Sequence, residues 1–506
     1  MQKIDLVKDS IIGCLMAGAA GDALGYPVEF MSRKEILSRY GEKGITEFEL
    51  TPEEITLVSD DTQMTLFTAN GLLWGETQNV LNGGDTPVED YVRGAYIDWY
   101  FTQTGESSPS FPPSTWLRHL PDLAHRRAPG TTCMGACENL LRGVGPLNNS
   151  KGCGGIMRVA PMGLYAAAFK ARNGRPLYDS LRLAEAGAKI AKFTHLHPLG
   201  YLPAALMTLL VAHLVPLTPE EAKATIVNFV NKDLDTMMQI EGNKNMEDKA
   251  FLKKLTLKAI DLAKYATSDA EAIRQLGEGW TAEEAWAISL YCAIRHIDSM
   301  EDAIIAAVNH DGDSDSTGSI TGNIMGAIYG YKAITDECLF CPEKLFYIGR
   351  RYKGEEKVVH ESQLKMQKLY FELTMELHEI ILALAEDLYS GCIITADGLI
   401  DTREKKLWKA RYCTKVEIPD LSQPELVEYL LKRFDYDEDI CYSLKTYSDK
   451  VSVARDERCQ YCGGTPVNLY YRNDPVAWVM LAGREGDLTV CPECGQWNHY
   501  HWFGMS

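Results

Sequence analysis

The stretch that decides the fold is GDSDSTGSITGNIMGAIYG, residues 312–330. Its glycines at positions 318, 322, 326 and 330 repeat every four residues, which places them along one face of a helix. The serine, threonine and asparagine side chains between them make the segment a poor membrane-spanning dimer helix. In a soluble protein, the same glycine groove lets a second backbone approach closely. We therefore predict a central, tightly packed helix here, and the glycines of residues 13–25 suggest a second one.

Helical periodicity extends from the start of the chain to about residue 390, and alternating strand patterns are almost absent there. TPEE at residues 218–221 and TAEE at residues 281–284 both match the capping box that opens a helix. The apolar run at residues 201–217 is short and contains two prolines and a histidine, so we interpret it as a buried helix rather than a membrane span. The first two-thirds of the chain are therefore expected to be all-α.

The composition limits the classes of partner. The 506 residues include 51 Lys and Arg against 70 Asp and Glu, a formal net charge of −19. Such acidity disfavours large nucleic-acid or anionic-membrane surfaces, which need clustered Lys and Arg, and suits binding of divalent cations. The N-terminus carries charges where a secretion signal needs an apolar core, so a cytoplasmic location is expected. The 14 cysteines then favour thiols or metal ligands over disulfides.

A first acidic cluster, Ser59-Asp60-Asp61-Thr62, precedes an apolar-periodic helix at residues 64–73. One interpretation is an ordinary helix start, with Ser59 as N-cap and the two acids complementing the helix dipole. The other is a hard-cation site, because adjacent carboxylates and a hydroxyl offer oxygen ligands to Mg²⁺ or Mn²⁺.

A second acidic cluster, HDGDSDST at residues 310–317, carries three aspartates at alternate positions. It is not an EF-hand loop, because the sixth and twelfth loop positions are Ser316 and Gly322 instead of Gly and Glu. A solvated capping loop and a metal site both stay open. Carboxylates so close together repel one another unless protons or cations compensate. If the two clusters converge, they make a two-metal site that positions and activates water.

Three further segments are weak signals individually. NSKGCGGIMR at residues 149–158 permits turns whose backbone N–H groups face a phosphate, although it lacks P-loop spacing and is equally compatible with an ordinary glycine turn. RAPGTT at residues 127–132 is a turn that enters a helix. In THLHP at residues 194–198, His195 either contacts a phosphate or ribose or caps the C-terminus of the preceding helix.

Six segments in this order resemble one family, the ADP-ribosylglycohydrolases. They are GCLMAGAAGDALGYPVEF (13–30), SDDTQMT (59–65), RAPGTT (127–132), NSKGCGGIMRVAP (149–161), THLHP (194–198) and GDSDSTGSITGNIMGAIYG (312–330). The resemblance covers about the first 330 residues. It implies an all-α fold around a site for two Mg²⁺ or Mn²⁺ ions, which cleaves the bond between C1″ of ADP-ribose and an acceptor.

The resemblance also implies roles for individual residues. Two trios match the metal ligands: Ser59, Asp60 and Asp61, then Asp313, Asp315 and Ser316. Glu29 matches an acidic residue near the metals, and the catalytic base is expected among Glu29, Asp60, Asp61 and Asp313. The positions that bind diphosphate or ribose match Gly152, Cys153, Gly154, Gly155 and His195. Such an arrangement suits the chemistry, because cleavage builds positive charge on the ribose ring that nearby carboxylates stabilise.

The C-terminal region departs from this pattern. Cys459, Cys462, Cys491 and Cys494 form C-x2-C-x28-C-x2-C, with a glycine after each pair. Paired thiolates followed by tight turns predict structural Zn²⁺ in a zinc-ribbon-like module, with buried free thiols as the alternative. Strands at residues 476–482 and 488–490, joined by a turn at 483–486, are expected between the pairs. Cys338 and Cys341 have no second pair, which favours buried thiols.

The sequence therefore predicts an all-α ADP-ribosylglycohydrolase-like domain at residues 1–345, a helical extension at 346–450 and a small β-rich zinc-ribbon-like module at 451–506. The expected function is magnesium-dependent removal of ADP-ribose from a protein or small-molecule acceptor. A two-metal nucleotide phosphohydrolase and a non-catalytic ADP-ribose-binding or immunity protein are the alternatives. Aromatic side chains in the module allow stacking on nucleic acid, although docking of a protein substrate explains them at least as well. No membrane partner is expected.

Overall fold

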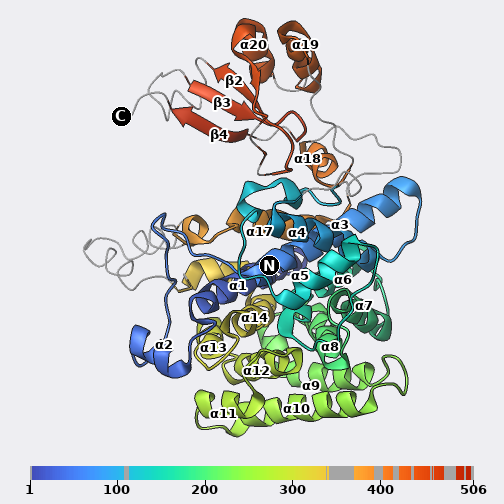
Figure 1. The fold of residues 1–506 in the computed structure, drawn as a ribbon, viewed down its shortest axis with the longest axis vertical. Helices are drawn as coiled ribbons and strands as arrows, with labels where there is room; N and C mark the ends of the chain where they lie inside the picture. Colours follow the sequence, from blue (N-terminus) through green and yellow to red (C-terminus); the bar gives the residue numbers. More distant parts are fainter. Residues whose placement is uncertain are drawn as a thin grey trace. The chain divides into compact units, whose positions relative to one another are not determined.

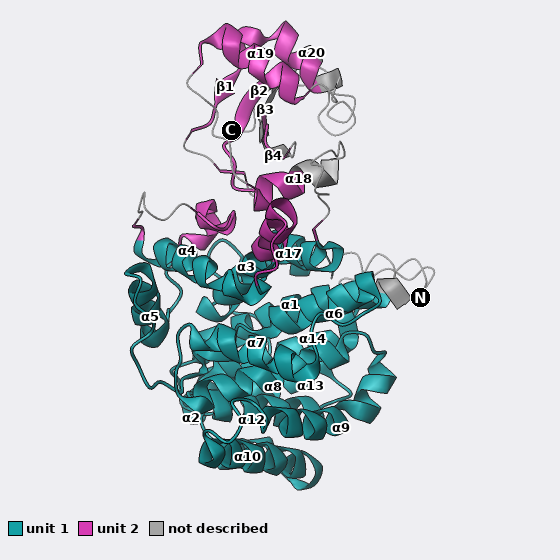
Figure 2. Ribbon diagram, turned by 90° about the vertical axis from the view of Figure 1, so that its right-hand side faces the viewer, with its two compact units in different colours: residues 1–72, 87–104, 126–391 teal, residues 73–86, 105–125, 392–506 magenta. Residues whose placement is uncertain are grey.

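The computed structural model describes residues 3–106, 113–337, 339–340, 368, 370–392, 403–413, 421–434, 438–455, 458–459, 461–471, 486–494 and 497–502. The chain forms two compact units, shown in Figure 2 in teal and magenta. Unit 1 comprises residues 1–72, 87–104 and 126–391, and unit 2 comprises residues 73–86, 105–125 and 392–506. The division at residues 345 and 450 stays a prediction.

Unit 1 is built from helices, as its periodicity predicts (Figure 1). Its helices are α1 (Lys3–Gly25), α2 (Arg33–Tyr40), α3 (Asp60–Asn82, whose last residues belong to unit 2), α4 (Val92–Thr104), α5 (Thr131–Leu141), α6 (Ala160–Asn173), α7 (Ser180–Lys192), α8 (Pro198–Leu214), α9 (Pro219–Met237), α10 (Met246–Tyr265), α11 (Asp269–Leu276), α12 (Ala282–Arg295), α13 (Met300–Val308), α14 (Ser314–Glu337) and α17 (His378–Ser390). In the described part of this unit, extended pairing is limited to two isolated bridges, Thr56 with Met375 and Gly152 with Thr281. The all-α prediction is confirmed.

The centre of unit 1 is the pair α1 and α14, whose backbones touch along their glycines. A Cβ placed on Gly322 would lie 2.0 Å from the carbonyl oxygen of Ala17. A Cβ placed on Gly21 would lie 2.1 Å from the carbonyl oxygen of Gly318. Real Cβ atoms do not approach so closely, so glycine is required on both helices. The prediction of two central, closely packed helices is confirmed.

Gly330 departs from the regular helix face that its spacing predicts. Its φ of +78° and ψ of 174° interrupt α14, so only the three preceding glycines continue one straight helical face. A side chain there would be strained by the positive φ and would also collide with the carboxylate of Asp9 on α1, whose Oδ2 is 2.0 Å from the ideal Cβ position. Four-residue spacing does not reveal such a break, because glycine suits both conformations.

Helices α1 and α8 contribute much of the apolar interior. By length and composition, one segment of the described chain, Leu6–Val28, is long and apolar enough to cross a membrane, yet 89% of its most apolar window is buried inside unit 1. It therefore behaves here as a core helix. The predicted buried helix at residues 201–217 corresponds to α8, whose residues from Leu199 to Val211 are all buried.

The two predicted capping boxes differ in outcome. Thr218 and Glu221 form the full reciprocal pair at the start of α9. Thr281 is the N-cap of α12, but its side chain makes no capping bond, so this second box is wrong. Glu284, its expected partner, instead accepts a hydrogen bond from the backbone N–H of Glu278 at 3.3 Å. The Glu284 carboxylate therefore bonds to the loop before α12 and not to the backbone of the N-cap residue.

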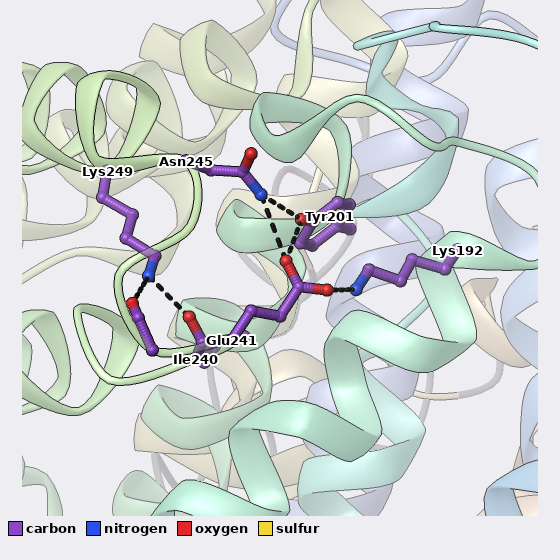
Figure 3. A network of polar contacts seen from close by, with 7 residues as sticks. Lys192, Tyr201, Ile240, Glu241, Asn245 and Lys249 are labelled. Carbon is purple, nitrogen blue, oxygen red and sulfur yellow. Dashed lines mark hydrogen bonds and ion pairs between the residues drawn. The ribbon is translucent and has the colours of Figure 1, made fainter.

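A buried lysine organises the turn between α9 and α10 (Figure 3). The Lys249 ammonium donates to the backbone carbonyls of Ile240 at 2.5 Å and Gly242 at 2.7 Å. Glu241, between them, pairs with Lys192 and accepts a hydrogen bond from the Tyr201 hydroxyl at 2.8 Å. The Lys249 ammonium thus gives hydrogen-bond partners to carbonyls of the turn, which lie outside both helices.

Unit 2 contains a small antiparallel sheet with helices beside it. Its helices are α18 (Arg403–Tyr412), α19 (Gln423–Arg433) and α20 (Glu438–Thr446), and its sheet order is β1 (Ser452–Val453), β2 (Val467–Tyr471), β3 (Gly486–Val490) and β4 (Trp497–Trp502). Leu430, Leu444 and Val467 meet in one apolar cluster that joins α19 and α20 to β2. The expected strand at 488–490 lies within β3. Residues 476–482 and the thiols of Cys338 and Cys341 lie outside the described residues.

Candidate active site

A cavity of about 380 Å³ in unit 1 collects residues from seven separate segments of the chain. It is lined by Glu29, Phe30, Asp60, Asp61, Ala128, Pro129, Gly130, Thr131, Thr132, Cys133, Gly152, Cys153, Gly154, Met157, His195, Trp280, Asp313, Asp315 and Ser316. Of the residues predicted to bind Mg²⁺ or substrate or to act in catalysis, only Ser59 and Gly155 are not among these. Both acidic clusters therefore open onto one space, together with the glycine-rich turn and His195.

The first acidic cluster stands at the N-terminus of α3. The Ser59 hydroxyl accepts a hydrogen bond from the Asp61 backbone N–H at 3.2 Å, so the helix-start interpretation is also correct. A residue outside α3 holds the Asp60 side chain: Oδ2 accepts a hydrogen bond from the backbone N–H of Gly130 at 3.2 Å. Ser59 is fully buried, and its hydroxyl donates to Asp61 Oδ2 at 3.4 Å.

The second acidic cluster stands at the N-terminus of α14. The backbone N–H of Ser316 lies 2.9 Å from Asp315 Oδ1 and 3.3 Å from Asp313 Oδ1. The loop before it turns sharply at Gly312, where φ is +119°. A side chain at Gly312 would collide with the backbone of Glu278, so glycine is needed to bring the acids to the cavity.

The buried carboxylates of the cavity need cations or protons to offset their negative charge. Burial, with the added charge of Asp315, raises the pKa of Asp60, Asp61 and Asp313 well above the usual range. Burial and the charges of Asp315 and Asp60 raise the pKa of Glu29 to about 9. Without a cation, these shifts favour the protonated form of the carboxyl groups.

The donor set fits divalent cations. The buried atoms Asp61 Oδ1 and Glu29 Oε2 have no hydrogen-bond partner within the described chain. Carboxylate and hydroxyl oxygens are the ligands that Mg²⁺ and Mn²⁺ prefer. Among the described cavity acids, no three residues bring ligand oxygens within 4.8 Å of one another.

Asp22 on α1 supports the first cluster and was not predicted. Its fully buried carboxylate accepts from the backbone N–H of Ser59 at 3.0 and 3.1 Å and from that of Thr62 at 3.0 Å. Burial, followed by the charge of Asp315, raises the pKa of Asp22 to about 7. The signal that could have revealed it is a lone carboxylate within the otherwise apolar residues 13–25.

The glycine-rich turn forms the 3₁₀ helix η5 (Cys153–Gly155) against His195. A Cβ on Gly154 would lie 2.8 Å from Cys133 Sγ and 3.1 Å from His195 Cε1, so the narrow turn leaves no room for a side chain. Gly155 faces the opposite way, toward the carbonyl oxygen of Gly200 on α8. It therefore positions the turn rather than lining the cavity.

Two aromatic rings at the cavity also escaped prediction. Phe30 and Trp280 stack with ring centroids 5.7 Å apart and planes 20° apart. Phe30 is 76% exposed, which is unusual for so large an apolar side chain and leaves its ring accessible to a ligand. Nothing in the spacing of these two residues, which lie far apart in the chain, indicates their contact.

The four cysteines of unit 2 come together as their pattern predicts. The sulfur of Cys459 lies 3.6 Å from that of Cys494, and the sulfur of Cys462 lies 3.6 Å from that of Cys491. In the described ranges they are the one group of His, Cys, Asp or Glu ligands whose atoms all lie within 4.8 Å of one another. Tetrahedral Zn–S bonds of about 2.3 Å separate sulfurs by about 3.8 Å, so the cluster has the size of a zinc site.

Comparisons with known proteins agree on one family. A family model described as ADP-ribosylglycohydrolase matches residues 4–348. Proteins named ADP-ribosylhydrolase ARH3 from Mus musculus and Homo sapiens are each 26% identical over 207 residues, which are 37% of this chain and 51% and 52% of those proteins. The chain thus spans about half the length of these curated relatives.

Two further matches are longer. An uncharacterized protein of Archaeoglobus fulgidus is 25% identical over 336 residues, 63% of this chain and 88% of that protein. A solved structure titled "ADP-ribosylglycohydrolase-related protein complex" aligns with a TM-score of 0.43 and 18% identity, over 76% of this chain and 99% of that chain.

Proposed function

Because this chain belongs to the ADP-ribosylglycohydrolase family, we propose that the cavity of unit 1 hydrolyses the glycosidic bond between ADP-ribose and an acceptor. One observation carries the proposal: two acidic clusters from distant parts of the chain line the same cavity as the glycine-rich turn and His195. The relatives named ADP-ribosylhydrolase support the class of substrate.

In this proposal, Ser59, Asp60 and Asp61 hold one side of a pair of Mg²⁺ ions, and Asp313, Asp315 and Ser316 hold the other. Bound ions of this kind lower the pKa of water and bind the hydroxyl groups of a sugar. The side chains of the protein carry out the remaining steps. The buried carboxylates stabilise positive charge that develops on the ribose ring, because the low dielectric of the cavity strengthens that attraction.

The catalytic base is proposed among Glu29, Asp60, Asp61 and Asp313. Glu29 has an unpartnered carboxylate oxygen at the cavity, which is available to accept a proton. The turn at Gly152 and Gly154 is proposed to receive the diphosphate, because both glycines line the cavity together with His195.

We also propose that Cys459, Cys462, Cys491 and Cys494 bind a structural Zn²⁺. Four buried thiols within 4.8 Å of one another support this assignment. An ion there would fix the turns beside β2 and β3, in a module whose apolar core is small.

The test is incubation of the full chain with acceptors that carry ADP-ribose on arginine, serine, a nucleic-acid base or a small molecule, in Mg²⁺ or in EDTA, with products identified by mass spectrometry. We expect intact ADP-ribose from at least one acceptor, in Mg²⁺ only. Asp315→Asn should reduce the rate at least about a hundredfold. Asp298→Asn should not, because Asp298 is exposed and lies outside the cavity.

Other products would favour the alternatives. Release of phosphate or a mononucleotide would point to a nucleotide phosphohydrolase. Binding of ADP-ribose without turnover of any acceptor, unaffected by Asp315→Asn, would point to a non-catalytic binding protein.

A further inference from the structure

His195 presents one ring nitrogen to the cavity and the other to the protein. Its side chain is only 2% exposed. Nδ1 lies 2.7 Å from the Thr194 hydroxyl oxygen. Nε2 has no hydrogen-bond partner in the part of the chain that the structure describes, and a Cβ on Gly152 would lie only 3.3 Å from it. A ring nitrogen that lines the cavity beside the glycine-rich turn and makes no bond to the described protein is available to a ligand.

Arg158, a fully buried cation, contacts Thr194 from the protein interior. Its Nη2 donates a hydrogen bond to the same Thr194 hydroxyl oxygen. The guanidinium also sits over the ring of Tyr96, 4.3 Å from its centroid, and Nη1 lies 3.4 Å from Cys133 Sγ. Among described residues, no carboxylate lies within ion-pair distance of Arg158.

The order of donors along this chain of contacts determines where the imidazole proton resides. A guanidinium only donates, so the Thr194 oxygen accepts from Arg158. The Thr194 O–H then has two acceptors in reach, His195 Nδ1 at 2.7 Å and the Ala191 carbonyl at 3.4 Å. The shorter contact is the stronger hydrogen bond, which favours Nδ1 as the acceptor. A neutral imidazole that accepts at Nδ1 carries its proton on Nε2.

The geometry points to Arg158 and Thr194 as positioning residues that hold His195 in the neutral tautomer with Nε2–H directed into the cavity, where it donates to an oxygen of bound ADP-ribose. The identity of the ligand rests on the proposed function, whereas the tautomer does not. Burial and the Arg158 charge lower the pKa of His195 to about 3, which agrees with a neutral ring. In this role His195 is a fixed hydrogen-bond donor and not a proton-transfer group.

The experiment combines nitrogen NMR of isotope-labelled histidine in the full chain with calorimetric titration of ADP-ribose in Mg²⁺. The His195 signals are assigned by their loss in His195→Gln. Wild type and Thr194→Ser, which keeps the hydroxyl, should show a single tautomer protonated on Nε2. Thr194→Val should lose that pattern, and its Kd for ADP-ribose should rise about tenfold, which corresponds to about 1.4 kcal/mol. Arg158→Lys should give an intermediate Kd.

Thr208→Val is the matched control, because the Thr208 hydroxyl is also buried but has no hydrogen-bond partner within the described chain. It should change neither the tautomer nor the Kd. A wild-type His195 protonated on Nδ1 would overturn the inference, as would a Thr194→Val protein with unchanged NMR signals and Kd. If no acceptor is hydrolysed while the tautomer and the ADP-ribose affinities change as expected, the proposed function fails and this inference stands.

Discussion

The carboxylate of Asp22 accepts hydrogen bonds from the backbone N–H of Ser59 at 3.0 and 3.1 Å. Helix α1 therefore caps helix α3 with a side chain from outside that helix. Since Asp60 and Asp61 follow Ser59 directly, this bond also determines where the first acidic cluster stands in the cavity.

Asp22→Asn should lower both stability and cation affinity. The amide keeps the size of the side chain but replaces one acceptor oxygen with a donor that faces the N–H groups of Ser59 and Thr62. We expect the free energy of unfolding to fall by about 1–3 kcal/mol in urea denaturation. Calorimetric titration should also show weaker Mg²⁺ binding. Asp235→Asn, at an exposed carboxylate, is the control, and equal behaviour of the two variants would contradict the capping role.

Gly322→Ala should destabilise unit 1, because the new methyl group would collide with the Ala17 carbonyl of α1. Overpacking of this kind costs about 1–3 kcal/mol. Gly135→Ala is the matched control, since Gly135 is inside α5 and a Cβ there meets nothing within 4 Å. That change should be neutral or stabilise by up to about 1 kcal/mol. Thermal unfolding of both variants gives the comparison, and similar melting temperatures would contradict the close helix contact.

Stability in EDTA should fall as the pH rises. The pKa of Asp22 is raised to about 7 and that of Glu29 to about 9, so the folded state holds these protons more tightly than the unfolded chain does. Their stabilising contribution is complete below about pH 4 and is lost as the pH rises through about 7 and then about 9. Mg²⁺ favours the ionised carboxylates, so its stabilising effect should grow over the same range. Melting curves at matched ionic strength test this, and a Mg²⁺ effect independent of pH would contradict it.

Cys494→Ser should remove the zinc and loosen unit 2. Elemental analysis of the purified full chain should find about one zinc per wild-type molecule and less in the variant. Cys441→Ser is the control, because a serine hydroxyl there can still donate to the Phe434 carbonyl as the thiol does. Wild-type protein free of zinc, or equal zinc content in both variants, would count against a structural zinc site.

The sequence was most informative for regularly spaced glycines and for paired cysteines. Glycines at every fourth position predicted a tightly packed helix, whose partner the structure identifies as α1, and paired cysteines predicted the sulfur cluster. The acidic motifs and His195 could be identified through their resemblance to a family, and the fold brings them to one cavity. Their roles as metal ligands and catalytic groups stay predictions.

The features that were missed depend on contacts between distant segments. The stacking of Phe30 on Trp280 and the capping by Asp22 have no local signature. The box at Thr281 was wrong because Glu284 found a closer backbone partner in the preceding loop. Local pattern indicates which bonds a residue is able to make, and the tertiary fold decides which of them form.

The pairing of α1 with α14 also affects how the protein folds during translation. Helix α1 is among the first parts of unit 1 to be synthesised, and α14 is among the last. Until residue 330 has left the exit tunnel, the apolar surface of α1 lacks its partner, and non-local contacts of this kind form slowly. The nascent chain is therefore expected to need protection from aggregation during translation, and fragments that end before residue 313 would lack half of the acidic cavity.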